Sequence, residues 1–148
     1  EGMDLEADYG QLRVDNIDGD SEINCKYGSL EFNDIRGDID INTKYTQVRG
    51  ADSPGPYDVE LKYGQLDLSD VKKSVKANGR YSEIEIDLDR TIDDYQVYCR
   101  TEYANINNNL PFEVEKIDNN VKLMEGKKGS GEVKIQIEND HGDINIYK

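Results

Sequence analysis

The sequence contains no tryptophan, two cysteines (Cys25 and Cys99) and a single histidine, His141, in 148 residues. Without a CxxC motif or a second histidine, these residues match no zinc site built from Cys and His. A serine nucleophile needs a histidine as its base, and only His141 is available. Pairs of carboxylates are inevitable among 32 acidic residues, so they do not identify a glycosidase. We therefore expect no catalytic residues, no cofactor and no enzymatic activity.

Basic residues are also scarce, since 18 Lys and Arg face 32 Asp and Glu, a formal net charge of −14. This charge repels polyanions, which argues against nucleic acid and anionic membrane surfaces as partners. No apolar run approaches the ~18 residues of a membrane-spanning helix, so no transmembrane segment is expected. Cations, basic proteins and neutral glycans remain as candidate partners.

Tyrosine, in contrast, recurs with a period of 18 residues. An aliphatic residue follows three places after each repeated tyrosine, and apolar residues then alternate with polar ones, which is the period of a β-strand. Two such columns are Tyr9, Tyr27, Tyr45, Tyr63 and Tyr81, and Leu12, Leu30, Val48, Leu66 and Ile84. One 18-residue unit cannot bury its apolar face alone, whereas stacked units can.

The repeat predicts an all-β fold: a single-domain β-solenoid (β-helix) over residues 1–148 with ~18-residue coils and two short strands per coil. Three hexapeptides per coil, as in a left-handed β-helix, would place aliphatic residues at every sixth position, which this pattern does not do. Regular coils are expected over 1–103, an irregular coil and loop over 104–130, and closing strands over 131–148. We expect Ile106 and Ile144 to continue the buried aliphatic column.

The ends of such a stack need covering, because an unpaired strand attracts other chains. The irregular stretch Leu110 to Ser130, Lys148 and His141 are candidates for the C-terminal end. At the N-terminal end, Met3 and Leu5 already occupy inward columns. We therefore expect at least one further half-coil or a cap upstream. Without it, the first strand should pair end to end with another molecule or be left frayed.

Cys25 and Cys99 both have inward parity and are separated by four coils in sequence counting, or roughly 19 Å at ~4.8 Å per coil. A disulfide needs Cα atoms within ~7 Å. We expect two buried, unbonded thiols.

Three exposed features have a functional and a structural interpretation. The tyrosine column is either an aromatic platform for a sugar or peptide or, as we favour, a ladder of rings packed at a corner. The basic column Lys26, Lys44, Lys62 and Arg80 is interpreted as a solvated face. The acidic corner Asp34, Asp52 and Asp70 is a candidate calcium site, although no calcium-loop motif matches and Asp also serves as an ordinary turn residue.

The segments 27–41 (YGSLEFNDIRGDIDI) and 129–146 (GSGEVKIQIENDHGDINI) resemble the putative-adhesin β-strand-repeat families of bacterial envelope proteins, relatives of the auto-transporter adhesin head domain. The resemblance implies export to the periplasm or cell surface and a non-enzymatic binding or scaffold role with a protein or glycan partner. The alternative is a small-ligand (lipid or glycan) binding protein with a groove near 110–124, lined by Phe112, Leu123 and Met124.

Overall fold

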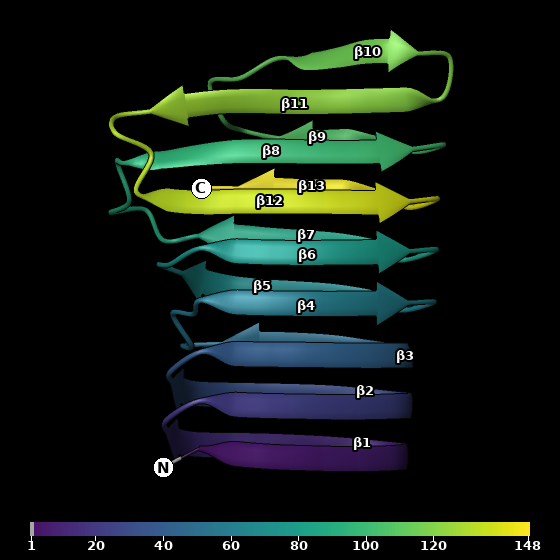
Figure 1. The fold of residues 1–148 in the computed structure, drawn as a ribbon, viewed down its shortest axis with the longest axis vertical. Helices are drawn as coiled ribbons and strands as arrows, with labels where there is room; N and C mark the ends of the chain where they lie inside the picture. Colours follow the sequence, from purple (N-terminus) through teal and green to yellow (C-terminus); the bar gives the residue numbers. More distant parts are fainter. Residues whose placement is uncertain (1) are drawn as a thin grey trace.

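The structure is a computed structural model that describes residues 2–148 as strands joined by turns (Figure 1). The first strands are long, and the later ones are shorter pairs. They are β1 (Met3–Asp18), β2 (Ser21–Arg36), β3 (Ile39–Ala51), β4 (Tyr57–Lys62), β5 (Gln65–Val71), β6 (Val75–Arg80), β7 (Glu83–Leu88), β8 (Tyr95–Glu102), β9 (Ile106–Asn108), β10 (Val114–Asp118), β11 (Val121–Lys128), β12 (Val133–Asp140) and β13 (Ile144–Tyr147). The described part of the chain has no helix able to cross a membrane.

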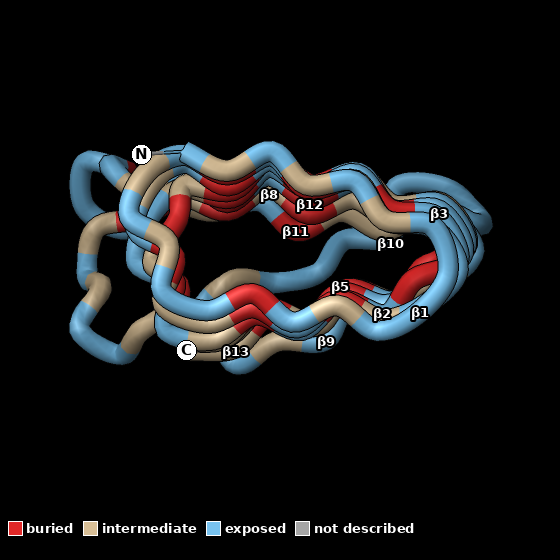
Figure 2. The backbone as a smooth tube through the Cα atoms, turned by 90° about the horizontal axis from the view of Figure 1, so that it is seen from below, coloured by how far each residue is buried: buried red, intermediate tan, exposed pale blue. Residues whose placement is uncertain are grey.

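The strands stack as parallel coils in a solenoid-like arrangement with the predicted 18-residue offset. Leu12 pairs with Leu30, Leu30 with Val48, and Val48 with Leu66. Seen along the stack, two walls enclose a buried interior (Figure 2). The predicted two short strands per coil are present as β4 with β5 and as β6 with β7. In the first three coils, however, one long strand continues around the tyrosine corner, so that prediction is wrong there. The continuation is possible because a single residue with positive φ bends the strand without interrupting its pairing.

The predicted aliphatic column forms the centre of one wall. Its members lie in register on successive layers in the order Leu12, Leu30, Val48, Leu66, Ile84, Ile144 and Ile106. All are buried except Leu12, which is half-buried because it lies on the outermost layer. The column is therefore confirmed, with an exposed end.

Size differences between layers are compensated locally. Phe32 projects beneath Gly50, where an added Cβ would lie 2.2 Å from the ring. On the same layer as Gly50, the buried Ser53 replaces an aliphatic residue, and its hydroxyl accepts a hydrogen bond from the Ile35 amide at 3.0 Å. Tyr57 fills the remaining space and donates to the Ser53 carbonyl. Burial raises the pKa of Tyr57, so the phenol stays a donor.

The C-terminal coil does not close the stack, which corrects the expected role of residues 131–148. β12 pairs in parallel with both β6 and β8, and β13 pairs with both β7 and β9. The last strands thus lie between two earlier layers (Figure 1). The chain leaves β7 through the longer connection 89–94, passes over one layer, and later returns to fill it.

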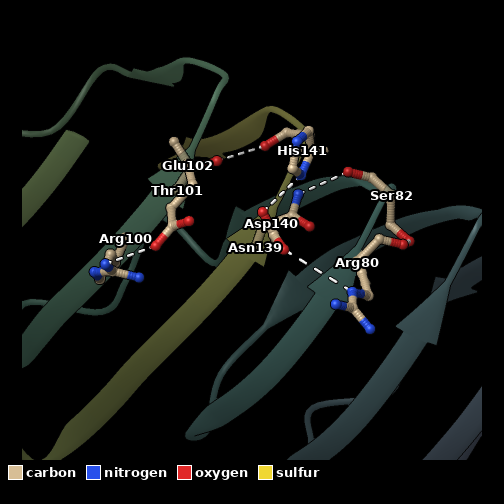
Figure 3. A network of polar contacts seen from close by, with 9 residues as sticks. Arg80, Ser82, Arg100, Thr101, Glu102, Asn139, Asp140 and His141 are labelled. Atoms are coloured by element: carbon tan, nitrogen blue, oxygen red, sulfur yellow. Dashed lines mark hydrogen bonds and ion pairs between the residues drawn. The ribbon is translucent and has the colours of Figure 1, made fainter. Parts of the chain in front are cut away.

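A polar network holds this inserted coil on both sides (Figure 3). The buried Asn139 side chain donates to the Ser82 carbonyl at 2.7 Å on one side. On the other side, the Thr101 hydroxyl donates to the Gly142 carbonyl at 2.7 Å. Asn139 fits because its neighbour in β6 is Gly79, where a Cβ would lie 2.5 Å from the Asn139 Oδ1. The inserted layer is thus hydrogen-bonded to both neighbours, although the buried Asn139 Oδ1 itself accepts no hydrogen bond.

The irregular stretch covers one end of the stack, as expected. β11 pairs antiparallel with β8, and β10 pairs antiparallel with β11. Leu110 and Met124 are buried, while the half-buried Phe112 packs edge-on against Tyr95 at 6.0 Å. Lys148 and His141 belong to the inserted coil and not to this cap. At the other end β1 pairs with β2, and the expected upstream coil or self-association stays a prediction.

Gly28 illustrates how closely the layers approach at the tyrosine corner. A Cβ at Gly28 would lie 1.8 Å from the Gly10 carbonyl oxygen. We therefore expect Gly28→Ala to force two layers apart and to lower the free energy of unfolding by about 1–3 kcal/mol. Urea denaturation followed by circular dichroism measures this. Gln11→Ala, on the same corner but exposed, is the control and should change stability by less than about 0.5 kcal/mol. Equal midpoints for the two variants would contradict the close approach.

Candidate functional site

The most distinctive surface feature is a ladder of seven aromatic rings along one corner of the stack. Neighbouring rings are stacked with centroids 4.5 to 5.2 Å apart. Its members, in order along the stack, are Tyr9, Tyr27, Tyr45, Tyr63, Tyr81, His141 and Tyr103. His141 stands between Tyr81 and Tyr103, as the inserted coil requires.

Every ladder residue has a left-handed backbone, with φ between 51° and 65°. This conformation costs a non-glycine residue roughly 1–2 kcal/mol. Ring stacking returns about 0.5–1.5 kcal/mol per neighbouring pair, which offsets much of the strain. The geometry supports the packing interpretation of the column. The faces of the inner rings are covered by their neighbours, while the inner tyrosines remain 44% to 46% exposed at their edges.

The predicted basic column lies immediately before the ladder in each coil. Lys26, Lys44, Lys62 and Arg80 are direct partners on successive strands. Arg80 lies 3.9 Å from Asp140. Among the ion pairs formed within residues 2–148, none involves the three lysines. The Lys44 ammonium lies 5.8 Å from the centre of the Tyr45 ring.

This run of like charges contrasts with another exposed column of the same fold. There, Arg13, Glu31, Arg49 and Asp67 alternate in sign on neighbouring strands. Opposite charges in register stabilise a pair, whereas like charges directly opposite each other destabilise it. The lysine column therefore opposes the stability of the stack, while the alternating column supports it.

A groove of about 530 Å³ runs across the coils beside the lysine column. The lysines form one wall, with Asp8 and Arg80 at its ends. Glu6, Asn24, Asn42, Glu60 and Asn78 form the opposite wall. We call the groove, its lysine wall and the adjoining ladder the ladder face. The ladder face contains a row of cations, a row of amide side chains and the edges of the phenol rings. From the sequence, the tyrosine column and the basic column were interpreted as two separate structural features.

The acidic corner is explained by its backbone. Asp34, Asp52 and Asp70, together with Asn16, all have positive φ values between 49° and 59°. Asp and Asn tolerate this conformation better than most residues. Asp34 also forms an ion pair with Arg36 at 3.0 Å. Within the described residues, no group of three or more His, Cys, Asp or Glu side chains is arranged to hold a metal ion. The corner is a turn of the coil, and its stacked carboxylates need no ligand to account for them.

The residues expected to line a ligand groove form part of the cap. Met124 is fully buried, Leu123 is half-buried, and Phe112 covers Gly126 closely enough that a Cβ there would lie 2.2 Å from its ring. Met124 and Phe112 are thus accounted for as packing over the last layer, whereas Leu123 has the opposite parity to Met124 and is not part of the core. A ligand groove at this segment stays a prediction.

The two cysteines are unbonded and buried, as predicted. Their separation differs from the predicted four coils. Cys25 belongs to β2 and Cys99 to β8, and β12 is inserted between β6 and β8. Five layer steps therefore separate them instead of four, or roughly 24 Å at ~4.8 Å per layer. Burial raises the pKa of Cys99 to about 12 and also raises that of Cys25.

We expect both thiols to resist labelling in the folded protein, because the thiolate is the reactive form. At pH 8, a maleimide or disulfide reagent should modify Cys99 at least tenfold more slowly than in denaturant, with Cys25 faster than Cys99. The raised pKa values also mean that the unfolded thiols ionise first, so stability should fall as pH rises above about 9. Peptide mass spectrometry after timed labelling measures the rates. Rapid labelling of native Cys99 would contradict its burial.

Comparisons with known proteins agree with this architecture. The family model described as Toastrack DUF4097 matches residues 1–147. A solved structure from Clostridium sporogenes ATCC 15579, described as a putative cell adhesion protein, has a TM-score of 0.53 and 12% sequence identity. The match covers 99% of this chain and 91% of that chain, and at this identity it shows the fold alone. The search of curated proteins found no match. Because the family model spans nearly the whole chain, the protein belongs to the Toastrack DUF4097 family.

Proposed function

We propose that this chain is a non-enzymatic, adhesin-like binding module of a bacterial envelope protein, exported to the periplasm or cell surface, and that it engages its partner through the ladder face. The observation that carries the proposal is the lysine column. Three unpaired cations stacked in register weaken the fold, in a protein whose net charge is −14. An anionic group of a partner would neutralise these charges on binding and remove the repulsion between the lysines.

The construction of the face suits a docking surface. Its side chains project from layers that share one continuous buried core and are hydrogen-bonded to the layers above and below. The backbone of such a surface is preorganised, so binding has to order only the side chains. The cell-adhesion description of the Clostridium sporogenes protein adds support from a chain with the same fold.

The absence of enzymatic activity is part of the proposal and is supported by how Ser82, Asp140 and His141 are arranged where they lie near one another (Figure 3). The His141 Nδ1 lies 2.6 Å from an Asp140 carboxylate oxygen. However, the buried Ser82 hydroxyl donates to the Arg80 carbonyl at 3.0 Å and accepts a hydrogen bond from the Gly64 amide. Ser82 is thus engaged in holding the corner together and is not presented to a substrate.

Bead adhesion tests the binding role. Beads coated with the protein should adhere to bacterial cells from a panel of Gram-positive and Gram-negative species. The triple variant Lys26→Gln, Lys44→Gln, Lys62→Gln should lose at least four-fifths of that adhesion. The control triple Lys116→Gln, Lys127→Gln, Lys134→Gln makes the same change in net charge at exposed positions away from the ladder face and should retain adhesion. Equal adhesion by both triples, or none by the parent protein, would overturn the proposal.

A further inference from the structure

The geometry of the ladder face points to a ligand class: we infer that its groove binds an extended acidic polysaccharide with one carboxylate per sugar, a polyuronate. The inference rests on the proposed binding role and specifies the partner. It follows from the spacing of the cations, the groups that surround them and the covering of the tyrosine ring faces.

Spacing favours a sugar chain over a peptide. The lysines are direct partners on neighbouring strands, so they recur once per layer, about 4.8 Å apart. Side chains on one face of an extended peptide recur at about 6.6–6.8 Å, two residues at a time. An acidic peptide would therefore lose register with the lysines within two or three layers. A linear uronate chain advances by about one layer per sugar. In a twofold conformation its carboxylates point to alternate sides, so those on one side recur about every two layers and can meet every second cation of the column, such as Lys26 and Lys62.

The opposite wall supplies hydrogen-bonding groups suited to sugar hydroxyls. Asn24 and Asn42 face the groove on the same layers as Lys26 and Lys44. An amide side chain both donates and accepts, which matches a hydroxyl in either role. Glu60 lies across from Lys62 on the next layer and reduces the positive charge there. At the other end of the groove, Asp8 is the direct strand partner of Lys26 and has the same effect. The strongest site is therefore expected at the layer of Lys44, between the two acidic ends.

The ladder contributes through its edges. Because the inner ring faces are already stacked on each other, a sugar cannot lie flat against them. Recognition in the groove must then come from ammonium groups and amides, which selects for a charged chain over a neutral one. The lysine column is also a narrow band of positive charge, because an acidic column lies four residues before it on the same strands. This acidic column consists of Glu22, Asp40 and Asp58. The lysines are about 13 Å from these carboxylates along a strand, beyond the ~8 Å Debye length at physiological salt, whereas Asn24 and Asn42 are only about 6.6 Å from them. The carboxylates of the ligand are therefore expected on the lysine side of the groove.

Titration calorimetry with defined oligosaccharides tests the ligand class. The probes are oligogalacturonate and oligomannuronate of six to eight sugars, with dextran of similar length as the neutral comparison and poly-glutamate as the peptide comparison. We expect both uronates to bind and dextran not to bind. Poly-glutamate should bind at least tenfold more weakly per chain of equal charge. Uronate affinity should fall steeply between 50 and 200 mM NaCl, because binding releases counterions.

Variants locate the site on the same protein. Lys26→Gln with Lys44→Gln should lower uronate affinity at least tenfold, while the control triple at Lys116, Lys127 and Lys134 should stay within about twofold. Circular dichroism confirms that each variant is folded. Three outcomes would overturn the assignment: no uronate binding, equal binding by the Lys26/Lys44 variant, or equal binding of dextran or poly-glutamate. If bead adhesion still depends on the ladder-face lysines in any of these cases, the binding role stands and only the ligand class is wrong.

Discussion

Deleting residues 131–148 should unfold the entire stack, although the deletion removes only the end of the sequence. These residues form an internal layer, with β12 between β6 and β8 and β13 between β7 and β9. Ile135, Ile137, Ile144 and Ile146 are all fully buried there. Burying one such side chain stabilises a protein by about 1.5–3 kcal/mol, so the four together contribute about 6–12 kcal/mol. That is comparable with the whole stability of a typical domain, about 5–15 kcal/mol.

The matched control removes residues 1–18, a segment of equal length at the outer end. β1 pairs with β2 alone among the strands of the described chain, and most of its inward side chains are half-buried. This variant should keep a cooperative urea transition with a lower midpoint. Circular dichroism and urea denaturation distinguish the two. A folded protein lacking residues 131–148 with a sharp transition would show that the inserted layer is dispensable, and would contradict the observed strand order.

Leu66→Ala should lower the free energy of unfolding by about 2–5 kcal/mol, because it leaves a cavity in the middle of a continuous column. Leu66 is 1% exposed and lies between Val48 and Ile84. Leu12→Ala makes the same chemical change in the same column at the outermost layer, where the side chain is already half-exposed.

The Leu12 variant should therefore lose less than half as much stability. Both values come from urea denaturation, provided that the dependence on urea concentration is unchanged. Equal losses at the two positions would mean that the column is not a continuous core with an open end.

The alternation of inward and outward residues could be predicted from the sequence, because it follows the period of a β-strand in every coil. Leu12, Leu30, Val48 and Leu66 share one position of the repeat, and parallel stacking in register follows from it. The buried, unbonded cysteines followed from the same parity. The left-handed backbone of the tyrosines could not be predicted from the sequence, because tyrosine rarely adopts this conformation and no local motif indicates it.

Only part of the ladder face could be predicted from the sequence. The tyrosine and lysine columns could be listed from their spacing, but their ion-pair partners could not. Asp40, Asp58 and Glu60 stand close to the lysines in sequence, yet the ion pairs of residues 2–148 leave those lysines out. Residues two apart on a strand project from the same face and can pair, as Arg100 and Glu102 do, but Glu60 and Lys62 are not paired. Asp40 and Asp58 lie four residues from Lys44 and Lys62, about 13 Å along the strand.

The sequence by itself determined the coil: its 18-residue period, its two walls, its inward columns and the irregular stretch 110–130 that covers one end. These features are local or repeat identically, so each unit specifies them independently. Only the tertiary structure decided the order of the layers. The inward residues of β12 and β13 would fit any layer, since Ile135, Ile137 and Ile144 have the same pattern as every other coil. Their place was chosen by contacts between segments far apart in sequence, such as Asn139 with Ser82 and Gly79, and by the connection long enough to pass over a layer.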